Sequence, residues 1–162
     1  LAVVVAMLVQ RRRGTSAAPR RVVAGVAVIL GLALALVLPD YRLLAWVAYL
    51  ERRWEDADAH SRESLRVARE IGMKQQIVEE LFCLAGVAAT SGDVARAARL
   101  ASAAELHHSL LEPQPTLSDA GFHHASIESA NAACDPETWE RASAEGRAMS
   151  LDAAAEYALS LA

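Results

Sequence analysis

The feature that most constrains this chain is a pattern of large and small apolar residues that occurs twice, forty residues apart. Each copy has a leucine-alanine pair, a further alanine, and a small residue after a short polar stretch. A repeat of this length is typical of stacked helical hairpins, in which each hairpin buries its apolar face against the next. We therefore expect a surface that binds a partner rather than a catalytic fold. The matched residues are Leu44, Ala45, Ala48 and Ala57 in the first copy and Leu84, Ala85, Ala88 and Ala97 in the second.

The composition favours helices. Of the 162 residues 54% are hydrophobic, many of them alanine, whereas aromatic residues make up only 5%. Alanine has the highest helix propensity and allows helices to pack closely, so the predicted fold class is all-α. The formal net charge of −4 does not resemble the basic footprint of a nucleic-acid binder. We expect no direct nucleic-acid binding by this chain.

The N-terminal residues 1–40 resemble a membrane segment. Leu1 to Val9 is continuously apolar, and a second uncharged apolar run extends from Val22 to Leu38. The second run reaches the lower limit of a transmembrane helix, about 17–25 residues. The loop 10–21 between the runs carries five arginines, and the positive-inside rule places such a loop in the cytoplasm. We expect one or two spans in a bacterial inner or plasma membrane, with the side of the repeat domain left open; a signal peptide and a buried soluble helix are the alternatives.

The chain begins at Leu1, inside an apolar run and without an initiator methionine. We interpret it as a fragment or a truncated gene model. Domains that are missing from it cannot be assumed to be missing from the native protein.

Residues 41–112 are predicted to form two helical hairpins. Gly72 and Gly92 are expected to end helices, Asp93 to cap the helix that follows, and Pro113 and Pro115 to end the array. The expected helices cover 42–53, 57–71, 74–91 and 94 to about 110, with the first turn at Trp54–Asp56.

Residues 113–162 are predicted to form shorter helices that cap the array. Ser118 or Asp119 is expected to start a helix that runs to Cys134, and Asp135 with Pro136 to start the next. Ser150 can cap a last helix, which runs to Leu161. Because roughly three repeats are needed for a stable solenoid, two hairpins require this tail to cover their last apolar face.

The repeated pattern resembles a tetratricopeptide repeat, although its spacing exceeds the usual period of about 34 residues. The resemblance consists of the large-small pair, the turn Gly92-Asp93 and small residues in the second helix, with Arg52-Arg53 in place of the Gly-Asp turn in the first copy. Small residues allow the two helices of a hairpin to approach closely. The residues to which we assign this packing role are Leu44, Ala45, Ala57, Leu84, Ala85, Gly92, Ala97 and Ala104.

The chain from Leu43 onward resembles the C-terminal helical region of bacterial signal-transduction ATPases, including LuxR-type transcriptional regulators. The motifs that carry this resemblance are the segments 69–72, 84–88, 92–93, 97–100, 103–105 and 145–151. The resemblance implies a sensor and interaction scaffold that an ATPase module precedes and a DNA-binding helix-turn-helix often follows. The chain has no Gly-x-x-x-x-Gly-Lys-Ser/Thr loop, so the ATP and DNA chemistry of that family transfers to no residue here. The N-terminal segment also departs from the family.

We therefore expect a non-catalytic helical-repeat scaffold in bacterial signalling or regulation, tethered to the membrane. Its partner would be a protein or peptide, and no cofactor is expected. The alternative is a fragment of a soluble ATP-dependent transcriptional regulator whose ATPase and DNA-binding domains are missing from this chain.

Two histidine pairs and two cysteines are the candidates for chemistry. Neighbouring residues on a helix point about 100° apart, so neither His107-His108 nor His123-His124 can chelate a metal by itself. One histidine of each pair could meet across the proline turn, with Glu105, Glu112 or Asp119 nearby, but we expect packed or solvated histidines and no metal. We interpret Cys83 and Cys134 as buried free thiols, with a disulfide as the alternative, and Cys83 as inert.

The remaining candidates are a charged stretch and three tryptophans. We expect the charges to form a solvated helix face with weak pairs, with a rim for a partner peptide as the alternative. For Trp46, Trp54 and Trp139 we expect core packing rather than ligand stacking. The charged residues are Glu51, Glu55, Asp56 and Asp58 with Arg52, Arg53, Arg62 and Arg66.

Overall fold

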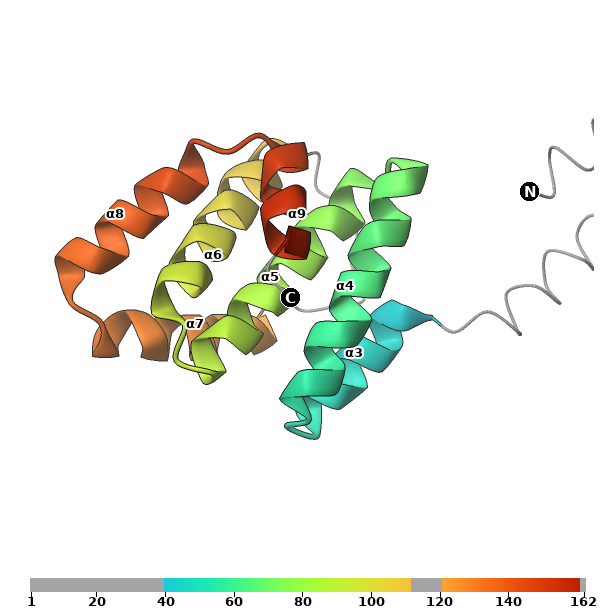
Figure 1. Cartoon of the computed structure of the whole chain (residues 1–162), viewed down its shortest axis with the longest axis horizontal. Helices are drawn as coiled ribbons and strands as arrows, with labels where there is room; N and C mark the ends of the chain where they lie inside the picture. The colour runs from blue at the N-terminus through green and yellow to red at the C-terminus, as the bar shows by residue number, and fades with distance from the viewer. Residues whose placement is uncertain (1–39, 112–120, 161–162) are drawn as a thin grey trace, which may run out of the picture. The chain divides into compact units, whose positions relative to one another are not determined.

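The computed structural model describes residues 40–111 and 121–160, and this part of the chain consists of seven helices without a strand (Figure 1). The all-α prediction is confirmed for these residues. They belong to one compact unit that begins at Asp40. The helices are α3 (Tyr41–Leu50), α4 (Trp54–Ile71), α5 (Lys74–Thr90), α6 (Val94–Ser109), α7 (Gly121–Ala133), α8 (Pro136–Arg147) and α9 (Leu151–Ser160).

The two apolar runs from which one or two membrane spans are predicted, Leu1–Val9 and Val22–Leu38, lie outside the described residues. Within residues 40–111 and 121–160, no helix combines the length and the apolar character that crossing a bilayer requires. The proposed helix start at Ser118 or Asp119 also lies outside the described residues.

The first hairpin turns earlier than the sequence predicted. The turn is Glu51–Arg53, whereas Trp54–Asp56 forms the first turn of α4. Arg52 adopts a left-handed φ of 58° in this turn, as Gly92 does with 82° in the turn between α5 and α6. An arginine gives no signal for this conformation, which mainly glycine and asparagine favour. The acidic Glu55 and Asp56 instead stabilise the N-terminus of α4.

The helix stop predicted at Gly72 and the three helix starts predicted downstream of it are confirmed, whereas the stop predicted at Pro113 and Pro115 lies outside the described residues. Gly72, with a φ of 74°, ends α4 in the left-handed conformation. The Asp93 carboxylate accepts a hydrogen bond from the Arg96 amide at 3.1 Å and caps α6. The Asp135 carboxylate accepts one from the Thr138 amide at 2.9 Å, with proline in the first turn of α8. In the same way the Ser150 hydroxyl accepts a hydrogen bond from the Ala153 amide at 3.2 Å, at the start of α9.

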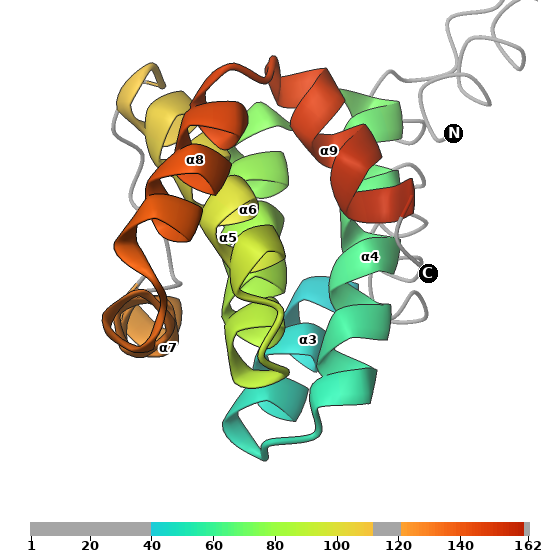
Figure 2. The same ribbon diagram turned by 60° about the vertical axis from the view of Figure 1, so that its left-hand side comes forward.

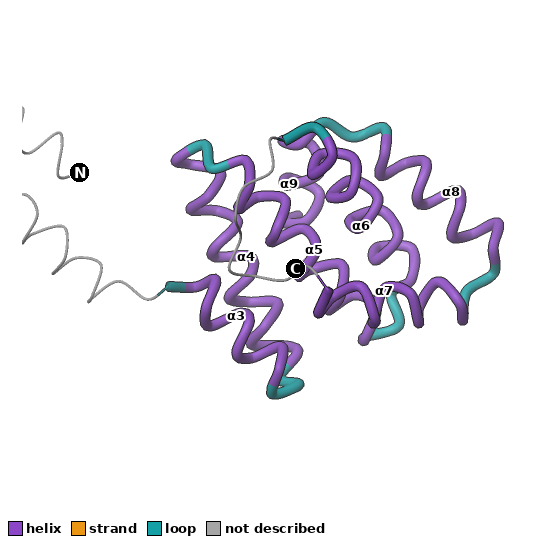
Figure 3. The backbone as a smooth tube through the Cα atoms, turned by 180° about the vertical axis from the view of Figure 1, so that it is seen from behind, coloured by secondary structure: helices purple, strands orange, loops and turns teal. Residues whose placement is uncertain are grey.

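Helix α5 lies at the centre of the described unit and packs against α4, α6, α7 and α9. The views in Figures 1 and 2 show α3 beside α4 and α5 beside α6, each pair joined by a short turn. In the tail, α8 packs along α6, and α9 packs against α4, α5 and α6. Seen from behind, α7 lies next to α5 and leads through a short loop into the N-terminal end of α8 (Figure 3).

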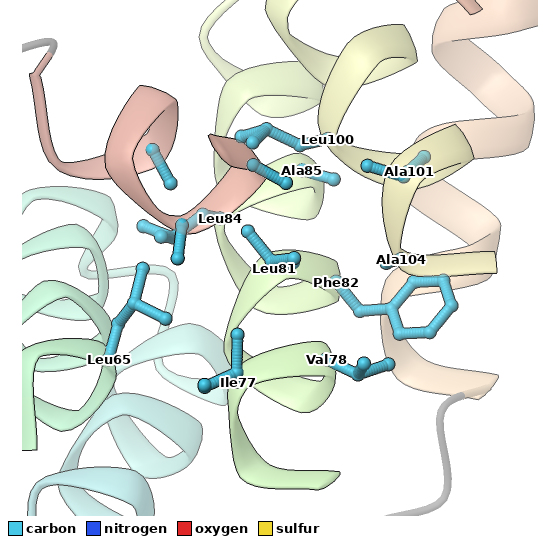
Figure 4. Packing of buried hydrophobic residues seen from close by; sticks show 14 of the residues in the cluster. Leu65, Ile77, Val78, Leu81, Phe82, Leu84, Ala85, Leu100, Ala101 and Ala104 are labelled. Atoms are coloured by element: carbon cyan, nitrogen blue, oxygen red, sulfur yellow. The ribbon is translucent and has the colours of Figure 1, made fainter. Parts of the chain in front are cut away.

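The core consists mainly of leucines and alanines, together with Ile77, Val78 and Phe82 of α5 (Figure 4). Leu65 of α4, Leu81 and Leu84 of α5 and Leu100 of α6 are all fully buried. Alanines between them keep the helices close, and α8 approaches the backbone of α6 closely at a glycine. A Cβ atom added to Gly146 would lie 2.2 Å from the carbonyl oxygen of Arg99.

The residues to which the sequence assigned hairpin packing occupy two kinds of position. The six members at 45, 57, 84, 85, 97 and 104 are buried, with exposed fractions of 1% or less. Gly92 lies in the exposed turn, and the side chain of Leu44 is 40% exposed. Leu44 belongs to the first described hairpin, so no earlier hairpin among the described residues covers it.

Candidate functional site

The outer surface of α3 carries an apolar stripe. Leu43, Leu44, Val47 and Leu50 are 51%, 40%, 41% and 48% exposed, and their spacing of one, three and four residues places them on one side of the helix. The inner side of α3 is buried through Ala45, Ala48 and Tyr49. We call the four aliphatic residues the apolar face of α3.

A polar groove lies between α6, α7 and α8. It encloses about 250 Å³ and is lined, among others, by Glu105, Glu128, Trp139 and Ser143. Ser143 is only 2% exposed, and its hydroxyl has no hydrogen-bond partner among the described residues. We call this cavity the α6–α8 groove. No local sequence pattern indicates this groove, because its residues come from three helices and only packing brings them together.

A polar network is buried between α4 and α5. The Ser64 hydroxyl donates to Glu80 Oε1 at 2.7 Å and accepts from Gln76 Nε2 at 2.9 Å. Burial raises the pKa of the Glu80 carboxyl from 4.5 to about 7, against the opposing effect of the Ser64 and Ser61 hydroxyls. Glu80 was not among the candidate residues predicted from the sequence. The only sequence signal for its burial is its position three residues after Ile77 and four before Leu84, on a buried face of α5.

The thiol of Cys83 lies at the end of this network. The Ser61 hydroxyl donates to Cys83 Sγ at 2.9 Å. Burial, followed by the charge of Glu80, raises the pKa of Cys83 to about 12, so the thiol stays protonated and is a poor nucleophile. Both cysteines are free, as predicted, but only Cys83 is buried; Cys134 is partly exposed.

The charged stretch divides into surface pairs and one structural cluster. Arg53 pairs with Glu51 and Asp56 at the surface, as expected of a solvated face. The prediction is wrong for Arg62, which is 8% exposed. Arg62 pairs with Asp58 and donates to the carbonyl oxygen of Ala158 at 2.8 Å, and Asp58 also pairs with Arg96 at 3.3 Å. These contacts join α4 to α6 and α9.

The tryptophans differ in burial. Trp54 packs on a second, smaller cluster of buried residues from α3, α4 and α5, and its ring meets the Tyr49 ring edge-on at 5.2 Å between centroids. Trp139 packs against the main core of leucines and alanines. Trp46 is 36% exposed, so its prediction as a core residue is wrong. Trp46 lies on α3, the first of the described helices, and the described residues include no earlier hairpin that could bury it.

One histidine of each pair packs on the same aromatic ring. The ring centroids of His108 and His124 lie 6.3 and 5.7 Å from that of Phe82, whereas His107 Nε2 lies 3.0 Å from the carbonyl oxygen of Met149. Within the described part of the chain, no group of three or more His, Cys, Asp and Glu residues could hold a metal ion. Glu112, Asp119 and the side chain of His123 lie outside what the structure describes.

A scan of protein-family models, a search of curated proteins and a search of solved structures each give no match to this chain. The function is therefore inferred from the residues and their geometry alone.

Proposed function

We propose that this chain is a tetratricopeptide-like helical-repeat scaffold that binds a protein partner in bacterial signalling or regulation, without catalysis of its own. We further propose that its N-terminal segment tethers it to the membrane. The observation that carries the proposal is the apolar face of α3. Single exposed leucines are common on protein surfaces, whereas four aliphatic side chains on one side of one helix are typical of an interaction site.

The position of this face in the array supports a helical occupant. In stacked hairpins, each hairpin covers the apolar surface of its neighbour, as α4 packs on α5 here. Helix α3 opens the described array, and its outer side keeps the apolar stripe that a further helix would bury. We therefore expect the partner to offer a helix with an apolar stripe of its own.

The free energy that burial of these four side chains can contribute indicates that the apolar face of α3 is the centre of an interface rather than the whole of it. Fully burying an exposed aliphatic side chain contributes about 1.5–3 kcal/mol, so four half-exposed ones contribute roughly 3–6 kcal/mol. Association costs about 4–15 kcal/mol in lost freedom of motion. The partner must therefore also make polar contacts around the stripe, as the rim residues of most interfaces do.

Site-specific photo-crosslinking in the native host tests this function. A photoreactive residue replaces Val47 on the apolar face in one strain and the exposed Glu55 of α4 in a control strain. We expect one partner protein to crosslink from position 47 and not from position 55. Adducts at position 47 with lipid or with a second copy of the chain alone would contradict the proposal.

The membrane tether rests on the apolar run 22–38 and the arginines before it, and it has a separate test. We expect the full chain to stay in the membrane pellet after alkaline carbonate extraction. Release into the supernatant would contradict the tether and leave the binding proposal standing. A compartment reporter fused after Ala162 would then show on which side the helices lie.

A further inference from the structure

The α6–α8 groove has an excess of negative charge. Glu105 of α6, Glu128 of α7 and Glu140 of α8 line it, together with Arg147 and His124. Arg147 pairs with Glu140 at 2.6 Å. Glu105 and Glu128 have no ion-pair partner among the described residues, so two carboxylates remain to attract a cation.

A second observation is independent of this charge. Ser143 is one of the residues that line the groove, and its hydroxyl is buried without a hydrogen-bond partner in the described part of the chain. Buried polar groups are nearly always hydrogen-bonded. An orphaned hydroxyl in a cavity wall is therefore a position at which a ligand could supply the missing partner.

The size and the lining of the groove narrow the ligand class. Ligand pockets usually enclose about 300–1,000 Å³, and this groove is smaller, at about 250 Å³. It suits one long side chain or a small linear molecule. Trp139 adds an indole ring to the lining, and indole is the aromatic group to which cations bind best.

We propose that the α6–α8 groove binds an alkyl chain that ends in a cation. The carboxylates of Glu105 and Glu128 neutralise the cation, Trp139 contacts the alkyl chain or the cation, and Ser143 provides a hydrogen-bonding group. Such a group occurs in lysine and arginine side chains and in free polyamines. The site lies on α6, α7 and α8, apart from the apolar face of α3, and does not depend on the proposed partner there.

Calorimetric titration of the full chain at low ionic strength tests the proposal. The probes are the capped amino acid Nα-acetyl-lysine methylamide, its uncharged analogue with norleucine, and 1,5-diaminopentane. We expect the lysine probe to bind at least about tenfold more tightly than the norleucine probe, because two carboxylates act on one cation. Tighter binding of the diamine than of the lysine probe would identify a free polyamine as the natural ligand. Tighter binding of the lysine probe would identify a basic protein segment as the natural ligand.

Matched variants assign the binding to the groove. The double variant Glu105→Gln/Glu128→Gln should weaken binding of the lysine probe by about tenfold. The control Glu137→Gln/Glu156→Gln removes the same charge from exposed positions outside the groove lining and should leave binding unchanged. Ser143→Ala should also weaken binding while the circular dichroism spectrum and the melting temperature show an intact fold.

Three results would overturn the proposal. One is no measurable binding of either cationic probe. Another is equal binding of the lysine and norleucine probes, which would show that the cation is not recognised. The third is an equal loss in the groove variant and in the control variant, which would show only a general attraction to an acidic protein.

Discussion

Replacing Gly146 with alanine should destabilise the protein, although alanine is the better helix former. An added Cβ atom would lie 2.2 Å from the carbonyl oxygen of Arg99 and 2.9 Å from its carbonyl carbon and Cα. All three are backbone atoms of α6, so no side-chain rotation can relieve the clash. Ordinary van der Waals contact would require α8 to move away from α6 by roughly 1 Å or more.

The expected cost follows from two opposing effects. Overpacking of a well-packed contact costs about 1–3 kcal/mol, and a backbone clash of this size belongs at the upper end. The higher helix propensity of alanine returns about 1 kcal/mol. The free energy of unfolding should therefore fall by about 2 kcal/mol, which lowers the melting temperature by roughly 5–10 °C for a unit of this size.

Urea unfolding of the full chain, followed by circular dichroism, measures this change. Ala144→Gly serves as the control, because Ala144 is exposed on the same helix and should lose about 1 kcal/mol through helix propensity alone. If propensity were the only effect, the two variants would shift the free energy of unfolding in opposite directions. A Gly146→Ala variant that is more stable than the wild type would refute the close packing of α8 on α6.

Three further predictions concern buried polar groups. Burial raises the pKa of Glu80 from 4.5 to about 7, so between these two pH values the folded state holds one proton more than the unfolded state. The free energy of unfolding should therefore fall by on the order of 3 kcal/mol as the pH rises through this range. Glu80→Gln should remove this part of the pH dependence, and an equal pH dependence of both proteins in urea titrations would contradict the prediction. Ser143→Ala removes a buried hydroxyl without a described partner, so the same titration should show unchanged stability or a gain of about 1 kcal/mol; a marked loss would reveal a missed hydrogen bond. Cys83 should react with a thiol reagent only after unfolding, because it is 5% exposed and its pKa is raised to about 12. Cys134 should react in the folded protein. Rapid modification of a folded Cys134→Ser variant, in which Cys83 is the remaining thiol, would contradict the prediction for Cys83.

The sequence predicted those parts of the fold that local chemistry specifies. Gly72 and Asp135 mark helix ends through backbone conformation and side-chain capping, which act over three or four residues. The first turn was misplaced because Arg52 adopts a left-handed conformation that its residue type does not announce. Leu44 fits the repeat pattern, but its exposure depends on whether another hairpin precedes it.

The candidate sites were harder to predict, because they depend on packing between helices. Glu80 looks like a surface charge in isolation, and only the contact of α4 with α5 buries it beside Ser64. Glu105, Glu128 and Ser143 are far apart in the chain and share no local pattern, yet they line one groove. The apolar face of α3 contained a usable signal, since four aliphatic residues lie on the side of the helix opposite its alanines.

The most direct test of the central claim is the dissociation constant of the partner identified by crosslinking at Val47, measured for two double variants. Leu43→Ser/Leu50→Ser removes two half-exposed side chains from the apolar face, and we expect the dissociation constant to rise by about tenfold or more, because each side chain contributes roughly 1 kcal/mol when it is buried. Val67→Ser/Ile71→Ser removes side chains of α4 that are 40% and 63% exposed, and it should leave the affinity unchanged. Equal effects of the two variants, or no effect of the first, would contradict a partner site on α3.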